Sequence, residues 1–183
     1  MFEFLDPVLA ALKSFFMFFI PLLYLAAVSS AGTLENAYQN ASPGLGYDKL
    51  IILNPAEIYT GGLTITDEKI GIKGNGSIID LQGSQIHITG NSVIEVDGCI
   101  IINGSYGLNM EGSVNALVTH STFYGNGMGI YYMCTAGLIE VYNTILANNT
   151  QYGFGCYEES QRILHFMDVY QNSGGNYMEY CPG

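Results

Sequence analysis

Residues 99–108, with the sequence CIIINGSYGL, contain a pattern that recurs along the chain. A mostly apolar run ends at one Asn or Asp, and a glycine-containing turn leads into the next apolar run. The polar residue of this pattern stands at Asp80, Asn103, Asn126, Asn148 and Asn172, at intervals of 23, 23, 22 and 24 residues. Such a near-constant interval is the signature of a protein built from stacked structural repeats.

The apolar residues within each repeat alternate as they do in a β-strand. Positions nine, seven and three residues before each polar residue are mostly apolar and are expected to point inward. They are Ile94, Leu117, Ile139 and Ile163, then Val96, Thr119, Val141 and His165, and then Ile100, Phe123, Ile145 and Val169. His165 breaks the pattern and indicates a register slip of one residue in the last repeat.

A single repeat of this length cannot bury its apolar face, whereas stacked repeats form one continuous core. Each strand would pair with its counterpart one coil away, at a distance of about 4.8 Å. The pattern therefore predicts an all-β fold, a parallel β-helix of about five coils. Asp80, Asn103, Asn126, Asn148 and Asn172 are expected to form a structural ladder of hydrogen-bonded side chains between coils.

The first 49 residues lack the repeat and divide into two segments. Residues 15–28 (FFMFFIPLLYLAAV) resemble the apolar part of a signal peptide, so residues 1–31 are interpreted as a signal peptide or an uncleaved N-terminal anchor. Residues 32–49 are predicted to form a helical cap that starts with Thr33 as its N-cap. The β-helix is then expected over residues 50–183, with its first strand at Leu50.

Several segments together resemble a known superfamily. They are LIILNPAEIY (50–59), GGLTITDEKIGIKGNGSIID (61–80), NGSYGL (103–108), GNGMGI (125–130), NNTQYGFG (148–155) and HFMDVYQNSGGNY (165–177). This order is similar to that of secreted bacterial right-handed parallel β-helix proteins of the pectin-lyase-like superfamily. The resemblance implies a right-handed fold, but it does not imply one activity, because the superfamily includes lyases, hydrolases, epimerases and adhesins.

The charge of the chain restricts its partners. The formal net charge is −11, with only five basic residues. A nucleic-acid-binding protein needs a positive patch to displace phosphate counterions, so nucleic acid is excluded as a partner. Neutral glycans, surface proteins or a cation such as Ca²⁺ remain plausible, and no resident cofactor is expected. Oligomeric state is not indicated.

The outward positions of the predicted middle strands contain the candidate site. Glu95, Asp97, His120, Glu140 and Tyr142 are expected on one solvent-facing sheet and are candidates for binding a sugar or Ca²⁺. Glu95, Asp97, Glu140 and His120 are also the catalytic candidates if the protein is an enzyme. The alternative interpretation is a solvated surface with a Lys73–Asp97 ion pair.

The four cysteines lack the spacing of a zinc site, so no metal site is predicted from them. Cys134 and Cys156 are 22 residues apart and could form a disulfide between neighbouring coils, and Cys156 with Cys181 is the competing pair. Cys99 is expected to be a lone buried thiol.

Three functions are compatible with the sequence. The first is a secreted or cell-surface protein that binds glycans or proteins along its rigid face without catalysis. The second is a polysaccharide lyase or glycosidase that uses the acidic residues of that face. The third is a structural spacer in a cell envelope. The short turns favour the first and third functions, because an enzyme of this type needs a groove walled by long loops.

Overall fold

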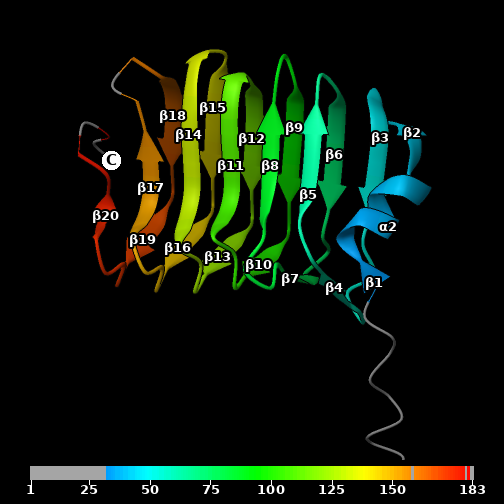
Figure 1. Cartoon of the computed structure of the whole chain (residues 1–183), viewed down its shortest axis with the longest axis horizontal. Helices are drawn as coiled ribbons and strands as arrows, with labels where there is room; N and C mark the ends of the chain where they lie inside the picture. Colours follow the sequence, from blue (N-terminus) through cyan, green and yellow to red (C-terminus); the bar gives the residue numbers. More distant parts are fainter. Residues whose placement is uncertain (1–31, 158, 180, 182–183) are drawn as a thin grey trace, which may run out of the picture. The chain divides into compact units, whose positions relative to one another are not determined.

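The computed structural model of the chain describes residues 32–157, 159–179 and 181. In this part of the chain, three sheets wind around one core, and every strand pairing except one is parallel (Figure 1). Successive strands pass from sheet to sheet and return one layer further along, which gives about six turns. The predicted parallel β-helix is confirmed, with about one coil more than expected. The predicted signal peptide or anchor, residues 1–31, lies outside the described residues.

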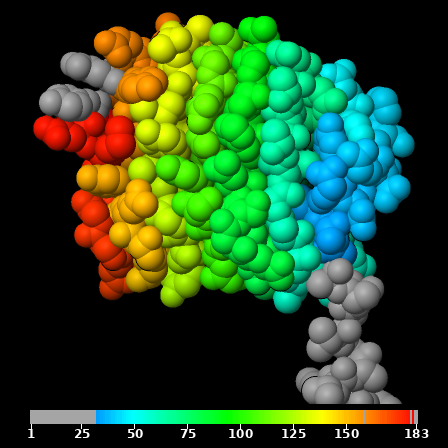
Figure 2. Space-filling view, viewed as in Figure 1, coloured from blue at the N-terminus to red at the C-terminus, as the bar shows by residue number. Residues whose placement is uncertain are grey.

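The three sheets are called A, B and C. Sheet A consists of β1 (Gly32–Thr33), β4 (Ile58–Thr60), β7 (Ile78–Asp80), β10 (Ile100–Ile102), β13 (Thr122–Tyr124), β16 (Ile145–Ala147) and β19 (Asp168–Tyr170). Sheet B consists of β2 (Ser42–Gly44), β3 (Tyr47–Ile52), β6 (Lys69–Lys73), β9 (Val93–Asp97), β12 (Asn115–Thr119), β15 (Leu138–Tyr142) and β18 (Gln161–His165). Sheet C consists of β5 (Leu63–Thr66), β8 (Gln85–Thr89), β11 (Tyr106–Ser113), β14 (Met128–Ala136), β17 (Tyr152–Cys156) and β20 (Gly175–Tyr177). In the space-filling view the coils follow one another as bands of colour in sequence order (Figure 2).

A short helix, α2 (Leu34–Asn40), takes the place of a sheet C strand in the first coil. Thr33 is its N-cap, as predicted, because its hydroxyl accepts a hydrogen bond from the backbone N–H of Asn36 at 3.0 Å. Leu34 is fully buried and anchors the helix to the core. The strand predicted to start at Leu50 already begins at Tyr47. No helix among the described residues has the length and apolarity needed to cross a membrane.

The core consists of one inward row from sheet A and two rows each from sheets B and C. In sheet B the inward rows are Ile70, Ile94, Ala116 and Ile139, followed by Ile72, Val96, Val118 and Val141, all of which are buried. In sheet A the inward row includes Tyr59, Ile79, Ile101, Phe123 and Leu146. Because each row runs across successive coils, neighbouring side chains pack at the spacing of the strands.

Several predicted inward residues point outward instead. Leu117 and Thr119 lie one position away from the inward residues Ala116 and Val118. The same error affects Ile100 and Ile145 in sheet A. In the last coil the predicted slip of one residue is confirmed, because Ile163 and His165 pair with the outward Glu140 and Tyr142. The cause is that paired residues in neighbouring coils are 22 residues apart in some places and 23 in others. A shift of one residue moves a side chain to the opposite face of its strand.

A ladder of hydrogen-bonded side chains between coils is present, but Asp80, Asn103 and Asn148 do not belong to its buried part. The predicted bond between Asp80 and Asn103 is confirmed, because Asn103 Nδ2 donates to Asp80 Oδ1 at 3.1 Å, although in the sheet Asp80 pairs with Ile102 rather than with Asn103. The buried ladder consists of Asn126, Asn149 and Asn172: the backbone N–H of Asn126 donates to Asn149 Oδ1 at 3.0 Å. In turn, Asn149 donates from its backbone N–H and its Nδ2 to Asn172 Oδ1, at 3.0 and 2.8 Å.

Asn103 and Asn148 have a different structural role. Both are exposed and have positive φ angles, 57° and 55°. Asn tolerates this left-handed conformation better than most residues do, so these two positions turn the chain. Asn148 therefore turns the chain, while the adjacent Asn149 belongs to the buried ladder. The repeat interval alone did not distinguish these two roles.

The last coil is closed by a disulfide between Cys156 and Cys181, whose Cα atoms are 5.6 Å apart. This was one of the two predicted pairs. The alternative with Cys134 is wrong, because Cys156 pairs across the sheet with Tyr132, and Cys134 lies two residues further along. Cys99 and Cys134 are free and buried. Burial raises the pKa of the Cys99 thiol to about 12, so this predicted lone thiol stays protonated.

Replacing Asn149 with Ala is expected to lower the free energy of unfolding by about 2–3 kcal/mol, because the buried N–H of Asn126 loses its acceptor. Urea unfolding of the full chain measures this change. The exposed Asn91→Ala variant is the control and should shift the midpoint little. Equal stability of the two variants would show that the ladder contributes nothing.

Removing the disulfide through the paired substitutions Cys156→Ala and Cys181→Ala is expected to lower the free energy of unfolding by about 3 kcal/mol. The reason is that the cross-link closes a loop with a sequence separation of 25 residues. The control is Cys134→Ala, which removes a buried thiol without removing a cross-link. A reductant should destabilise the native chain and the control but leave the double variant unchanged.

Candidate functional site

The candidate site lies on the outer face of sheet B. One outward row contains Gly71, Glu95, Leu117, Glu140 and Ile163, and the next contains Lys73, Asp97, Thr119, Tyr142 and His165. Four of the five predicted site residues, Glu95, Asp97, Glu140 and Tyr142, stand in these rows. The fifth, His120, follows β12 directly at a turn, with a φ of 48°.

An ion-paired cluster forms one end of the site. The ammonium group of Lys73 contacts Glu95 and also pairs with Asp97, where Nζ and Oδ2 are 3.3 Å apart. The hydroxyl of Tyr47 donates a second hydrogen bond to Glu95. The predicted Lys73–Asp97 pair is thus confirmed, and Lys73 bridges two carboxylates.

These contacts set the protonation states of the cluster. Partial burial alone would raise the pKa of Glu95, but hydrogen bonds from Lys73 and Tyr47 outweigh it and hold the pKa below its ordinary value. Burial alone would lower the pKa of Lys73, but its two carboxylate partners raise it. Burial and the bond to Glu95 raise the pKa of Tyr47 to about 12. At neutral pH the carboxylate and the ammonium are therefore charged, and the tyrosine is neutral.

Asp97 connects this cluster to His120. The hydroxyl of Thr119 donates to Asp97 Oδ1 at 2.8 Å, and His120 Nδ1 lies 3.1 Å from the same oxygen. Burial would raise the pKa of Asp97, but the bonds from Thr119, His120 and Lys73 lower it. The imidazole is 65% exposed and its Nε2 lies 3.3 Å from Asn143 Nδ2. His120 is therefore held between two coils at the edge of the site.

Glu140 and aromatic rings form the other end of the site. The Tyr142 hydroxyl donates to Glu140 Oε2 at 3.0 Å, and this bond raises the pKa of Tyr142. The ring of Tyr142 stacks on His165 from the next coil, with centroids 5.7 Å apart. Leu117 occupies the position between Glu95 and Glu140 in the same row. An apolar surface therefore separates two acidic acceptors.

A shallow groove of about 300 Å³ runs over this face. Its lining includes Tyr47, Lys69, Glu95, Asn115, Leu117, Leu138 and Glu140. The ring of Tyr47 forms one wall because it lies against Gly71: a Cβ atom at Gly71 would be only 3.0 Å from Tyr47 Cδ2. Glycine in this row thus makes room for the ring that contacts Glu95.

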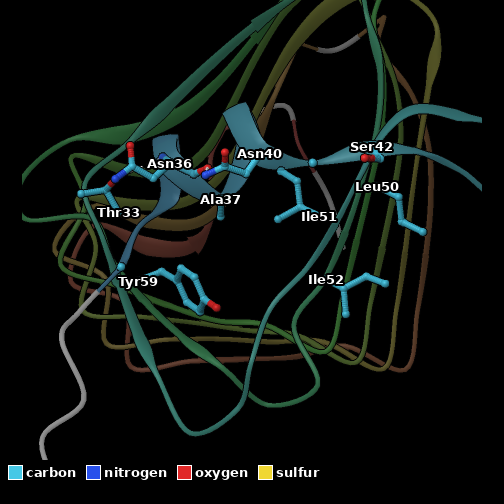
Figure 3. A pocket seen from close by; sticks show the side chains of 11 residues that line it. Thr33, Asn36, Ala37, Asn40, Ser42, Leu50, Ile51, Ile52 and Tyr59 are labelled. Atoms are coloured by element: carbon cyan, nitrogen blue, oxygen red, sulfur yellow. Dashed lines mark hydrogen bonds between the residues drawn. The ribbon is translucent and has the colours of Figure 1, made fainter.

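A second cavity of about 390 Å³ lies at the N-terminal end, between α2 and the first coil (Figure 3). Asn36, Ala37 and Asn40 approach it from the helix, and Ile51 and Tyr59 approach it from the coil. Its described lining has one titratable side chain, Tyr59, and contains no carboxylate or imidazole. The sheet B groove has the richer chemistry and is the candidate functional site.

The described residues contain no group of three or more His, Cys, Asp or Glu side chains that could hold a metal ion. In the sheet B site the ammonium group of Lys73 already pairs with Glu95 and Asp97 and offsets one of their two negative charges. A Ca²⁺ ion at these carboxylates would have to compete with Lys73.

Sequence reasoning missed Tyr47, Lys69, Asn115, Leu117 and Leu138 as site residues. Tyr47 fell within the predicted cap, and Leu117 was assigned to the core. The signal for Tyr47 was Gly71, because a glycine inside a strand often marks a close approach of another group. The signal for Leu117 was the 22-residue spacing, which places Ala116 rather than Leu117 beside Ile94.

Comparison with known families supports the architecture. A family model described as "Right handed beta helix region" matches residues 58–181, from the start of β4 to the second cysteine of the disulfide. Comparisons with curated proteins and with solved structures yield no match.

The ion-paired cluster makes a pH-dependent contribution to stability. Because the folded-state pKa values of Glu95 and Asp97 are lowered, this contribution is complete above their ordinary values of about 4 and is lost as pH falls through the lowered values. Lys73→Met is expected to raise both carboxyl pKa values, as measured by NMR titration of the side-chain carboxyl signals. In the control Lys69→Met they should not move, since Lys69 faces the Tyr47 ring. Unchanged values in Lys73→Met would contradict the assignment.

Proposed function

Because this chain belongs to the right-handed β-helix family, whose stacked coils hold outward side chains in regular rows, we propose that it binds a neutral glycan on sheet B. The observation that carries the proposal is the groove, in which Leu117 separates the carboxylates of Glu95 and Glu140. Its volume of about 300 Å³ suits one or two sugar units of a longer chain.

The lining of the groove matches the chemistry of a sugar. Glu140 and Asn115 offer acceptors to hydroxyl groups, while Leu117 and Leu138 offer apolar surface to the C–H face of a pyranose ring. Glu95 and Glu140 stand two coils apart, roughly 10 Å, so they would contact neighbouring units of one glycan. The stacked rings of Tyr142 and His165 extend the surface beyond Glu140.

Charge favours a neutral ligand over an acidic one. The net charge of the chain is −11, and Glu95 and Asp97 are held ionised. Lys73 is already paired with both carboxylates. A polyuronate or a phosphorylated glycan would therefore be repelled by this face.

The protonation states support binding rather than cleavage. A glycosidase needs one carboxylic acid with a raised pKa, whereas the pKa values of Glu95 and Asp97 are lowered. A lyase needs a base that can accept a proton, but the raised pKa of Lys73 keeps that side chain protonated. The pKa directions of these three side chains therefore favour binding over a polysaccharide lyase or a glycosidase, and the groove favours binding over a structural spacer.

We further propose that the protein acts outside the cytoplasm, at the cell surface or after secretion. The Cys156–Cys181 disulfide supports this location, because such bonds persist in oxidising compartments. The apolar run at residues 15–28 supports export in the same way.

A glycan array probed with the full chain tests the function. We expect binding to neutral oligosaccharides without release of products. For the best ligand, Glu140→Gln should weaken binding about tenfold, since a hydrogen bond to a charged acceptor contributes roughly 1.5–3 kcal/mol. Glu111→Gln on sheet C is the matched control and should bind like the native chain.

Other outcomes would replace the proposal. Release of sugar products that disappears in Glu140→Ala would indicate a lyase or glycosidase. Absence of binding across neutral and acidic glycans would leave the structural spacer. Equal losses of affinity in Glu140→Gln and Glu111→Gln would place the glycan site elsewhere on the molecule.

A further inference from the structure

The middle of sheet C contains two buried polar atoms that lack a hydrogen-bond partner among the described residues. One is Oδ1 of Asn109, a residue that is only 6% exposed. The other is Nε2 of His87, which pairs with Asn109 across β8 and β11. Their neighbours Ile88 and Met110 point to the core, so both side chains share the outer face of the sheet. Buried polar atoms nearly always have partners in proteins, so two adjacent exceptions require an explanation.

A carboxylate lies beside both residues. Glu111 Oε1 is 3.7 Å from His87 Nε2, which is too far for a hydrogen bond. The same oxygen lies 3.4 Å from Asn109 Nδ2, and this nitrogen also lies 3.3 Å from Gln85 Oε1. Both of these hydrogen bonds are long and they share one donor, so they hold the amide group weakly.

The spacing of these atoms is that of ligands around a metal ion. Around a tetrahedral zinc ion with bonds of about 2.1 Å, neighbouring ligand atoms are about 3.4 Å apart. Turning the Asn109 amide by 180° exchanges its nitrogen and oxygen, so Oδ1 takes the place beside Glu111 that Nδ2 holds. An imidazole nitrogen, a carboxylate oxygen and an amide oxygen then lie within reach of one ion.

The charge on sheet C favours a cation at this place. The four described Lys and Arg residues all belong to sheet B strands, and they are Lys49, Lys69, Lys73 and Arg162. A cation at Glu111 therefore competes with no ammonium group of its own sheet, in contrast to one at Glu95 or Asp97, which pair with Lys73. The net charge of −11 adds a general attraction for cations.

We propose that His87, Asn109 and Glu111 bind a divalent transition-metal ion such as Zn²⁺, with solvent completing its coordination shell. An imidazole ligand favours such an ion over Ca²⁺ and Mg²⁺, which prefer oxygen ligands. Because one ligand is an amide, this set differs from sites built from three or more His, Cys, Asp or Glu side chains. The side chain of Glu111 is 54% exposed, so its rotation admits the ion.

The bound ion would connect β8 to β11 and thus two successive coils. The inference does not depend on the glycan site, which lies on sheet B.

Imidazole NMR of the full chain identifies the side chain that binds zinc. The chain has three histidines, so the ring nitrogens of His87, His120 and His165 can be followed separately. Titration with zinc chloride should shift the His87 Nε2 signal, with saturation at micromolar zinc, and should leave the other two rings unchanged. Calcium chloride at the same concentrations should shift none of them, because Ca²⁺ takes oxygen ligands.

Two substitutions test the ligands by isothermal titration with zinc chloride. Glu111→Gln removes the charged ligand and should weaken binding about tenfold, whereas Asn109→Asp adds a charged ligand and should strengthen binding about tenfold. Such a gain would not follow from a purely structural Asn109. Glu140→Gln on sheet B is the matched control and should bind zinc like the native chain. Glu111→Gln should in turn retain glycan binding, so failure of one proposal is distinguishable from failure of the other.

Three results would overturn the proposal. If no saturable shift of His87 occurred even at millimolar zinc, the cluster would hold no ion. Shifts confined to His120 or His165 would place zinc on sheet B. An Asn109→Asp variant that folds but binds zinc no more tightly than the native chain would remove Asn109 from the ligands. Circular dichroism verifies each fold, and zinc should raise the urea midpoint of the native chain more than that of Glu111→Gln.

Discussion

Every feature of this protein depends on the hydrogen-bonded stacking of each coil on the one before it. Parallel pairing sets the distance between coils, and the buried Asn126–Asn149–Asn172 ladder fixes their register where the chain turns. Side chains from different repeats therefore form rows, in which each side chain lies between its counterparts in the previous and the next coil. All side chains of a row point either to the core or to the solvent. The register of the strand pairing therefore decides which residues form each outer surface.

The period of the repeat, the all-β class and the capping helix could be predicted, because each rests on local pattern. The exact register could not, since turns of different length change the spacing between paired residues, for example from 20 between Ile58 and Ile78 to 24 between Ile70 and Ile94. Asn148 and Asn149 illustrate the limit: two adjacent asparagines meet the same interval, yet one adopts a left-handed turn and the other is buried. Only the three-dimensional pairing separates these roles.

The candidate site was predicted in part for the same reason. Glu95, Asp97, Glu140 and Tyr142 lie on strands whose register was assigned correctly, so their shared face followed from alternation. Leu117 was assigned inward because β12 is offset by one residue. Tyr47 reaches the site from the first coil, across Gly71, and a contact between residues 48 positions apart has no local signal.

The three-sided cross-section allows different surfaces to exist on one small domain. The charged groups that hold Glu95 and Asp97 ionised lie on sheet B, whereas the exposed isoleucines lie on sheet A. Each side chain of an outward row contacts mainly its neighbours within the sheet, so a substitution on one face has few contacts through which to disturb another. The stacking that orders each surface therefore also keeps the surfaces independent, and one face can change its chemistry without altering the other.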